Sequence, residues 1–167
     1  MKETKSIKLV KFNKKFISKK YISWLNDKNL MKYSENRYKK HTKLSCKKYL
    51  NNFNKTHNKF FAIIDTDNSD HIGNITAIID KKNNTADIGI LIGKKNRGYG
   101  QIAWKTMMNY LFKINIRKIT GGCMRNNKAM IKIFIKSKMN FEYIKKKHFL
   151  YDKKKLIDFI GYYKFKK

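Results

Sequence analysis

Three strand-like runs follow one another in the middle of the chain, and they constrain the fold more than any other feature. They read KFFAIID (59–65), HIGNITAIID (71–80) and ADIGILIG (86–93). The segments between them, TDNSD and KKNN, are rich in turn-forming residues. Consecutive strands joined by short polar turns predict an antiparallel meander.

The flanking segments alternate between helical and strand-like periodicity. Strands are predicted at 6–12, 116–123, 141–151 and 154–165, and helices at 18–27, from Thr42 through Phe53, from Tyr99 through Ile114, and at 127–138. The helix from Tyr99 has the clearest pattern, because its apolar residues recur every three or four positions. The order β-α-α-β-β-β-α-β-α-β-β indicates an α+β fold.

Size and residue usage indicate one domain spanning residues 1–167, without a repeat or a flexible linker. No apolar run approaches the roughly 18 residues of a membrane span, so we expect no membrane insertion. The first residues lack the pattern of a secretory signal. The two cysteines, Cys46 and Cys123, make neither a disulfide framework nor a metal motif. A cytoplasmic protein without a metal is expected.

The formal net charge of +30 is spread along the whole chain. Only four of the 41 basic residues are arginine and proline is absent, a pattern that indicates drift in base composition. We therefore interpret the lysines as a solvated surface and do not expect a nucleic acid to be the substrate. The charge would still attract polyanions, including a phosphorylated cofactor.

A glycine-containing loop, KKNRGYGQIAWK (94–105), joins a predicted strand to a predicted helix. The first N–H groups of a helix lack internal partners and lie at the positive end of its dipole. Glycine permits close approach of a ligand to the backbone, so the loop is either a phosphate cradle or a tight turn. Neither the P-loop pattern nor the three-glycine dinucleotide pattern is present, which leaves coenzyme A as the candidate ligand.

The chain resembles the GNAT acyltransferases, in the branch of ribosomal-protein N-terminal acetyltransferases and amino-sugar N-acetyltransferases. The resemblance lies in YISWLNDKNLMKYSENRY, HIGNI, ADIGILIG, RGYGQIAWKTMMNYLF, RKITGGCMRNNKAMIKI and KKHFLYDKKKLIDFIGYYKF, in that order. It implies the GNAT fold, a mixed and mostly antiparallel twisted sheet of about seven strands, splayed at the centre and flanked by about four helices.

The resemblance also implies acetyl-CoA as the acetyl donor and assigns its binding residues. The pyrophosphate pattern falls on Lys95, Asn96, Arg97, Gly98, Tyr99 and Gly100, followed by Gln101. Lys95 and Asn96 depart from the family's usual residues, and the loop is shorter than in many relatives. The backbone at Ile90, Leu91 and Ile92 would pair with the pantetheine arm. Asn127 would contact the pantetheine or act as a helix N-cap.

Candidate catalytic residues follow from the same alignment. Asp87 and Glu35 are the candidate bases, each weighed against a surface role. The tyrosine that protonates the leaving thiolate in many relatives falls on Phe134, so Tyr99, Tyr143 or water would serve instead. The scattered histidines are interpreted as surface or core residues. Arg37 either binds the substrate or forms a structural ion pair.

The expected function is transfer of an acetyl group from acetyl-CoA to an amine of low pKa. At pH 7 an α-amine with a pKa near 8 is neutral in about one molecule in ten, whereas a lysine-like amine is neutral in only about one in a thousand. The expected acceptor is either an amino sugar linked to a nucleotide or a protein N-terminus. The alternative is a non-catalytic module that binds coenzyme A or RNA. The apolar C-terminal strands either contact a second subunit in a homodimer or close the sheet.

Overall fold

The computed structural model describes residues 6–93, 98–152 and 154–167, and its centre is a mixed β-sheet. Within the described ranges the sheet has seven strands in the order β1-β2-β3-β4-β5-β7-β6. Their bounds are β1 Ile7–Lys11, β2 Lys59–Asp65, β3 His71–Asp80, β4 Thr85–Ile92, β5 Lys118–Met124, β6 Asn140–Asp152 and β7 Lys155–Phe165. Every neighbouring pair is antiparallel except β4 and β5, which are parallel. The predicted meander is β2-β3-β4, and the α+β fold class is confirmed.

Four α-helices accompany the sheet in the described part of the chain: α1 Lys19–Asn26, α2 Lys43–Asn54, α3 Tyr99–Lys113 and α4 Lys128–Lys136. The predicted element order is therefore confirmed. Thr42 caps α2 through a reciprocal pair of hydrogen bonds with Ser45, as its position before the apolar repeat indicated. Two short 3₁₀ helices, η1 Lys14–Phe16 and η2 Glu35–Tyr38, were not predicted, because each has only three or four residues and no periodicity to reveal it.

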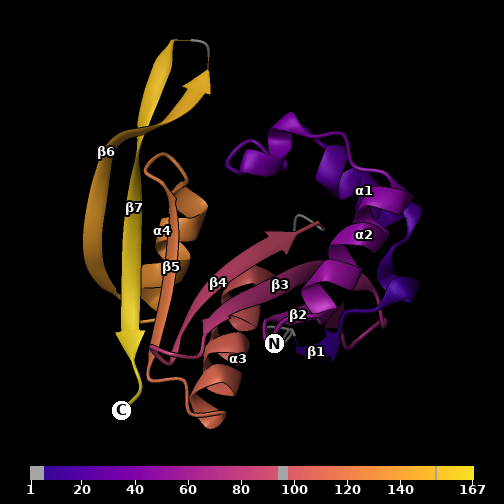
Figure 1. Ribbon diagram of the computed structural model, residues 1–167, viewed down its shortest axis with the longest axis horizontal. Coiled ribbons are helices and arrows are strands. Elements are labelled where there is room, and N and C mark those ends of the chain that lie inside the picture. Colours follow the sequence, from indigo (N-terminus) through magenta and orange to yellow (C-terminus); the bar gives the residue numbers. More distant parts are fainter. Residues whose placement is uncertain (1–5, 94–97, 153) are drawn as a thin grey trace, which may run out of the picture.

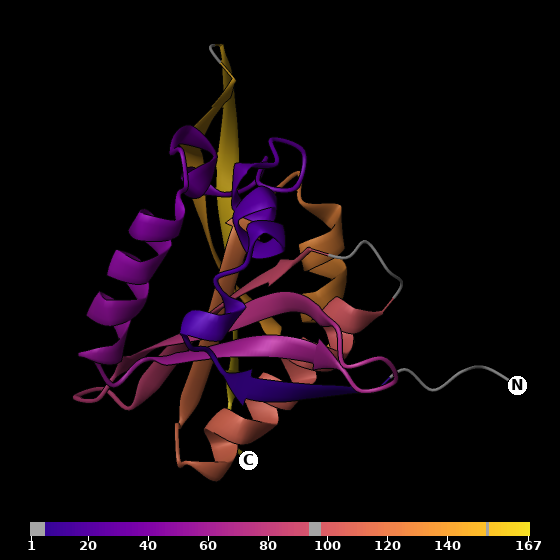
Figure 2. The same cartoon turned by 90° about the vertical axis from the view of Figure 1, so that its right-hand side faces the viewer.

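The sheet buries a separate apolar cluster on each face. Side chains that point to one face, such as Ile63, Ile75 and Ile88, pack with α3 and α4. Phe60 and Ala62 point to the other face and pack with α1 and α2. The period-two alternation of the strands thus supplies both cores. Figures 1 and 2 show α1 and α2 beside β1–β3, and α3 and α4 on the opposite side next to β4 and β5.

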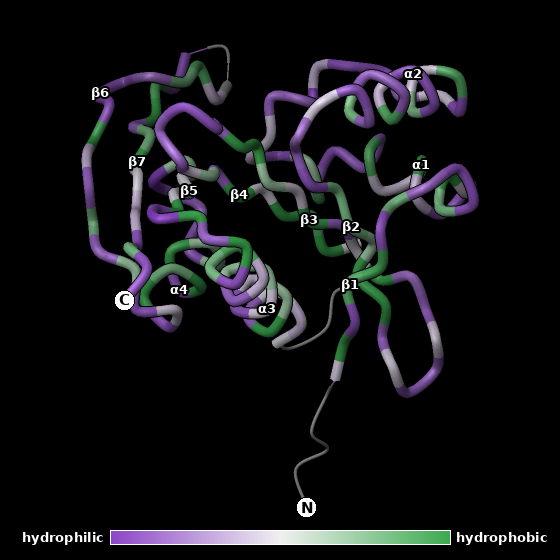
Figure 3. The backbone as a smooth tube through the Cα atoms, turned by 60° about the horizontal axis from the view of Figure 1, so that its bottom comes forward, coloured by the Kyte–Doolittle hydropathy of each residue, from purple (hydrophilic) through white to green (hydrophobic). Residues whose placement is uncertain are grey.

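The C-terminal hairpin completes the sheet. β7 pairs with β5 over the full length of β5, from Lys118 opposite Phe165 to Met124 opposite Phe159. β6 pairs with β7 and forms the outer edge. Figure 3 shows apolar residues along the central strands and hydrophilic residues in the loops around them. No helix of the described residues is long and apolar enough to span a membrane.

Phe134 lies at the centre of the α3–α4 side of the core, and its packing there leads to a prediction about stability. Its fully buried ring stacks on Tyr162 at 4.7 Å and meets Trp104 edge-on at 5.4 Å. Phe134→Ala should lower the free energy of unfolding by about 3–5 kcal/mol, because the surrounding rings cannot close the cavity. Ile135→Ala, which changes a side chain that is 62% exposed, should cost well under half as much. Urea denaturation of both variants measures the difference, and equal losses would contradict this packing.

Candidate functional site

The two central strands separate after a short parallel pairing. β4 pairs with β5 only where Thr85, Ala86 and Asp87 face Lys118, Ile119 and Thr120. β4 stays paired with β3 as far as Ile92, and β5 stays paired with β7 as far as Met124. Figure 1 shows β4 and β5 diverging from this point. Every second residue of Ile88–Ile92 therefore turns its N–H and C=O toward a side of β4 that has no partner strand among the described residues.

The N-terminus of α3 lies next to the end of β4. The N-cap is Gly98, with a φ of 101°, a left-handed conformation that favours glycine, and no side chain caps the helix. A Cβ built on Gly100 would lie 3.1 Å from Ile133 of α4 and 3.7 Å from Ile92 of β4, so the first turn of α3 packs closely against both elements. The positive end of the α3 dipole thus lies beside the unpaired stretch of β4. Lys95, Asn96 and Arg97 lie outside the described residues.

Asn127 begins α4 on the other side of this opening. Its Oδ1 accepts a hydrogen bond from the backbone N–H of Met130 at 3.2 Å, which is an N-cap interaction. The same residue lines a cavity that is also bounded by α1, α2 and residues 89–91 of β4. No described residue accepts a hydrogen bond from its Nδ2, so the amide N–H groups can bind a ligand while the oxygen caps the helix. The two interpretations of Asn127 are therefore compatible.

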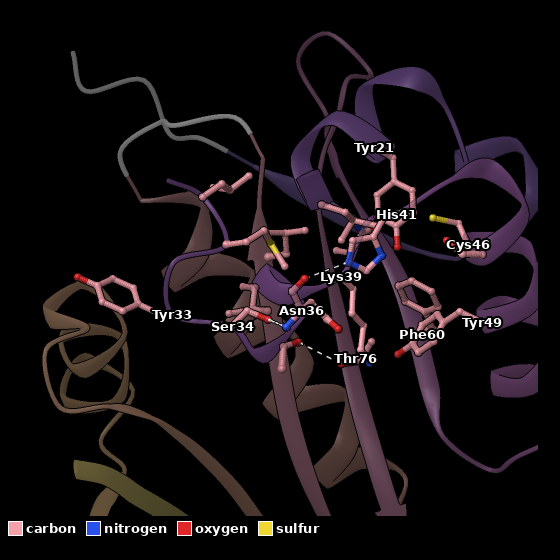
Figure 4. Close-up of a pocket in the computed structure, with 18 of the residues that line it drawn as sticks. Tyr21, Tyr33, Ser34, Asn36, Lys39, His41, Cys46, Tyr49, Phe60 and Thr76 are labelled. Atoms are coloured by element: carbon pink, nitrogen blue, oxygen red, sulfur yellow. Dashed lines mark hydrogen bonds between the residues drawn. The ribbon is translucent and has the colours of Figure 1, made fainter. Parts of the chain in front are cut away.

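A cavity of about 570 Å³ lies on the sheet face opposite α3 and α4. Its floor is formed by Asn74 and Thr76 of β3 and by residues 89–91 of β4, which places Ile90 and Leu91 at the cavity wall. Aromatic side chains line much of the remaining wall: Tyr21 of α1, Tyr33, Tyr49 of α2 and Phe60 of β2. Figure 4 shows Tyr33 at one end of the cavity and Tyr21, Tyr49 and Phe60 at the other.

Two lysines, Lys39 and Lys40, line this cavity together with the imidazole of His41, and no Asp or Glu of the described residues does. Burial raises the pKa of Tyr21 and of Tyr49, so both hydroxyls remain protonated at neutral pH. The cavity therefore offers positive charge and neutral hydrogen-bond donors, and it would attract an anionic or neutral ligand rather than a polycation.

His41 was interpreted from the sequence as a surface or core residue, yet the fold places it in the cavity wall. Its backbone N–H donates to Asn26 Oδ1 at 2.9 Å and its carbonyl accepts from Asn26 Nδ2 at 2.8 Å. Its Nε2 lies 3.3 Å from the carbonyl oxygen of Asn36, a contact drawn in Figure 4. Residues 36 and 41 approach each other only because this loop folds back, so no local motif identifies the histidine.

Asn74 presents an unsatisfied donor at the cavity floor. Its side chain is buried, and Oδ1 lies 3.0 Å from Nε2 of His71. Burial lowers the pKa of His71, which is therefore neutral near pH 7. Asn74 Nδ2 has no hydrogen-bond partner among the described residues, and a buried unpaired amide is costly. A polar ligand atom in the cavity would satisfy it.

Asp87 lies at the point where β4 and β5 separate. Its carboxylate accepts a hydrogen bond from the Thr120 hydroxyl at 2.7 Å. Surrounding protein atoms raise the pKa of Asp87 although water still reaches the side chain, and the Thr120 hydrogen bond partly opposes this. Asp87 points to the same sheet face as Gly89 and the cavity, about 7 Å away along the strand. It does not line the cavity itself.

Glu35 and Arg37 lie in η2, but neither side chain lines the cavity. The Arg37 guanidinium, 11% exposed, donates to the Tyr38 hydroxyl at 2.6 Å and to the Leu150 carbonyl at 3.3 Å. It also pairs with Glu35 at 3.5 Å. These contacts connect η2 to the β6–β7 hairpin. Sequence spacing could not reveal Leu150 as a partner, because it is 113 positions away.

Tyr99 and Gln101 also point away from the cavity. The Tyr99 hydroxyl is buried and donates to the Asp65 carboxylate, which raises the pKa of Tyr99 to about 12. Gln101 donates from Nε2 to the Ser137 hydroxyl at 2.7 Å, which links α3 to the end of α4. The structure therefore groups Ile90, Leu91 and Asn127 at the cavity, with Gly98 beside the end of β4, and places Tyr99 and Gln101 in the packing beneath.

Comparisons with known proteins identify the domain family and the fold. A family model described as an acetyltransferase (GNAT) domain matches residues 14–140. The fold is similar to that of a GNAT-family acetyltransferase from Bacillus anthracis, with 21% identity, a TM-score of 0.81, and coverage of 96% of this chain and 95% of that one. Comparison with curated protein sequences finds no significant match.

Two further structures are similar over nearly the whole chain. One is spermidine N-acetyltransferase from Vibrio cholerae in complex with CoA and spermine, with 16% identity, a TM-score of 0.84, and coverage of 96% of this chain and 95% of that one. The other is RimL, a ribosomal L7/L12 alpha-N-protein acetyltransferase in complex with coenzyme A, with 14% identity, a TM-score of 0.83, and coverage of 96% and 94%.

Proposed function

The chain belongs to the GNAT acetyltransferases, and from this membership we propose that it transfers an acetyl group from acetyl-CoA to the amine of a nucleotide-linked amino sugar. The observation that carries the donor assignment is the separation of β4 from β5 beside the uncapped N-terminus of α3. The observation that carries the acceptor assignment is the cationic, aromatic cavity on the adjoining sheet face.

The residues at the opening fit the chemistry of acetyl-CoA. The free backbone groups of Ile90–Ile92 would pair with the amide groups of the pantetheine arm as an added strand does. The helix dipole and the N–H groups at Gly98 and Gly100 would hold the pyrophosphate. We include Lys95, Asn96 and Arg97 in the proposed pyrophosphate site because the family's pyrophosphate pattern falls on them. Bound acetyl-CoA supplies an activated acetyl group, and Asn127 Nδ2 would help to orient it.

Asp87 is the base that we assign to the reaction. It would accept the proton of the acceptor amine through a water molecule, since it lies one step along β4 from the cavity floor. Glu35 is engaged by Arg37, which favours Asp87 over Glu35. For the thiolate we favour Tyr143 or water over Tyr99. Tyr143 is 39% exposed, and its pKa is raised first by partial burial and then by the negative charge of Asp87.

The acceptor is assigned from charge and shape. A polyamine would meet Lys39 and Lys40 without an Asp or Glu from the described lining, which disfavours a polyamine acceptor. The phosphates of a nucleotide carrier would pair with these two lysines, and the rings of Tyr21, Tyr33 and Tyr49 suit the faces of a sugar or base. A protein N-terminus also has an amine of low pKa, so it is the competing acceptor to be assayed.

Calorimetry with acetyl-CoA at moderate salt tests the donor site. Wild-type protein should bind, and Gly98→Trp should weaken binding by about 100-fold, since its side chain would block the approach of a phosphate to the helix N-terminus. Ile114→Trp adds the same ring at the exposed far end of α3 and should leave affinity within about twofold. Circular dichroism checks folding. Heat with RNA but none with acetyl-CoA would support a non-catalytic RNA-binding module instead.

The pH profile of kcat/KM tests Asp87. Activity should fall as pH decreases through the raised pKa of this carboxyl, because the base must be ionised. Thr120→Val removes the hydrogen bond that lowers this pKa and should move the acidic limb to higher pH without lowering the plateau more than a few-fold. Asp87→Asn should lower the plateau about 100-fold. An acidic limb unchanged in Thr120→Val would exclude Asp87 as the titrating group.

A thiol-release assay across acceptors tests the cavity. Nucleotide-linked amino sugars should be acetylated with kcat/KM at least tenfold above spermidine. The double variant Lys39→Gln/Lys40→Gln should raise KM for the nucleotide-linked acceptor about tenfold and change it little for the free amino sugar, because only the former carries phosphates. Lys47→Gln/Lys48→Gln on the outer face of α2 is the matched control. Highest activity with spermidine or with N-terminal peptides would reassign the acceptor.

A further inference from the structure

A second cavity, of about 730 Å³, lies where the C-terminal ends of α3, α4 and β7 meet. Figure 1 shows the chain's C-terminus at the same end of the molecule as the C-terminal turn of α3. Seven of the twelve lining residues are lysines: Lys105, Lys113, Lys136, Lys138, Lys164, Lys166 and Lys167. No acidic residue of the described ranges lines the cavity. Lysine makes up more than half of this lining but under a quarter of the whole chain.

Part of this lysine cluster has structural partners. Lys164 Nζ donates to the Ser137 carbonyl at the end of α4 at 2.8 Å, and Lys166 Nζ donates to Asn115 Oδ1 at 2.6 Å. Lys113 and Lys136 stand in the last turns of their helices, where positive charge complements the dipole. These roles account for four of the seven lysines.

The remaining three lysines, Lys105, Lys138 and Lys167, have neither a side-chain hydrogen-bond partner among the described residues nor a position in the last turn of a helix that would account for their charge. Lys105 lies in the middle of α3, Lys138 follows α4, and Lys167 follows β7. Within the described part of the chain none of the three forms an ion pair or donates a side-chain hydrogen bond. All three are exposed at the rim of the cavity. They approach one another only in the folded chain, because they come from three different elements.

The lysines repel one another at this site. The pKa of Lys164 is lowered first by burial and then by the charges of Lys138, Lys167 and Lys105, which line the same cavity. Since no Asp or Glu side chain of the described lining offsets this repulsion, a bound anion would relieve it. Met108 and Ser137 are buried and Phe112 is half-buried, so the exposed lysines surround a shallow, open depression with a largely buried floor.

We propose that this cavity binds a compact polyphosphorylated small molecule. Its volume lies within the range of about 300–1,000 Å³ that is usual for small-ligand sites. Lysine ammonium groups bind phosphate as point charges without a fixed orientation, which suits a chain of linked phosphates. Lys105, the lining residue of α3 nearest to Gly98, lies about 10 Å along the helix from it, and the lining continues from there to Lys113 at the other end of α3. No described residue lines both this cavity and the first one. It is therefore a site distinct from the one assigned to acetyl-CoA.

A calorimetric titration of the protein with inorganic tripolyphosphate, at constant ionic strength, tests the proposal. Saturable binding with one ligand per chain is expected, with orthophosphate at least about tenfold weaker because it carries fewer charges. The triple variant Lys105→Gln/Lys138→Gln/Lys167→Gln should weaken tripolyphosphate binding at least about tenfold. Lys47→Gln/Lys48→Gln/Lys55→Gln, on and just after the exposed face of α2, removes the same charge and should change binding less than twofold.

Further arms of the titration distinguish the source of the phosphates and the location of the site. A nucleoside triphosphate that binds more tightly than tripolyphosphate would identify a nucleotide as the ligand, and weaker binding would favour a linear polyphosphate. Gly98→Trp should leave tripolyphosphate binding unchanged, and acetyl-CoA should not compete with it. The proposal fails if both triple variants lose affinity equally, if acetyl-CoA competes, or if a single-stranded RNA oligonucleotide binds more tightly per phosphate. Thermal unfolding without ligand checks that the variants fold.

Discussion

The separation of β4 from β5 is the constraint on which the rest of the structure depends. After Asp87 and Thr120 the two strands share no further pairing, although each remains fully paired on its other side. A sheet interior normally satisfies its backbone groups, so an unpaired stretch leaves donors and acceptors for water or a ligand. Packing beneath β5 holds it in place: a Cβ on Gly121 would lie 2.8 Å from the Trp104 ring, so β5 lies directly on α3.

Three features converge on this separation because of the chain's topology. β4 leads directly into α3, which brings the helix N-terminus to the end of the unpaired stretch. β5 leads into α4, which brings Asn127 to the opposite side. The loop between α1 and α2 then covers the free sheet face and supplies Lys39, Lys40 and His41. The donor and acceptor regions are therefore built from different segments, and the β4 backbone is common to both.

Much of the fold could be predicted from local patterns, and the exceptions share a physical cause. Strands 59–65 and 71–80 were predicted with the bounds observed, since alternation and turn chemistry are local. The inward orientation of Tyr99 could not be predicted, because it depends on Asp65 from β2. The link from Arg37 to Leu150 and the place of His41 in the cavity were missed for the same reason. Each depends on residues that are distant in sequence, or on a loop that has no periodicity.

The sequence by itself determined the order and type of the elements, the glycine at the start of α3 and the excess of positive charge, because these depend on neighbouring residues and composition. The tertiary structure decided where on the surface the positively charged side chains cluster. Lysines spread evenly along the sequence gather at the ends of α3, α4 and β7, while acidic side chains of the described residues are absent from both cavities. Such clusters arise from contacts between distant elements, so only the folded chain distinguishes a binding surface from a uniformly charged one.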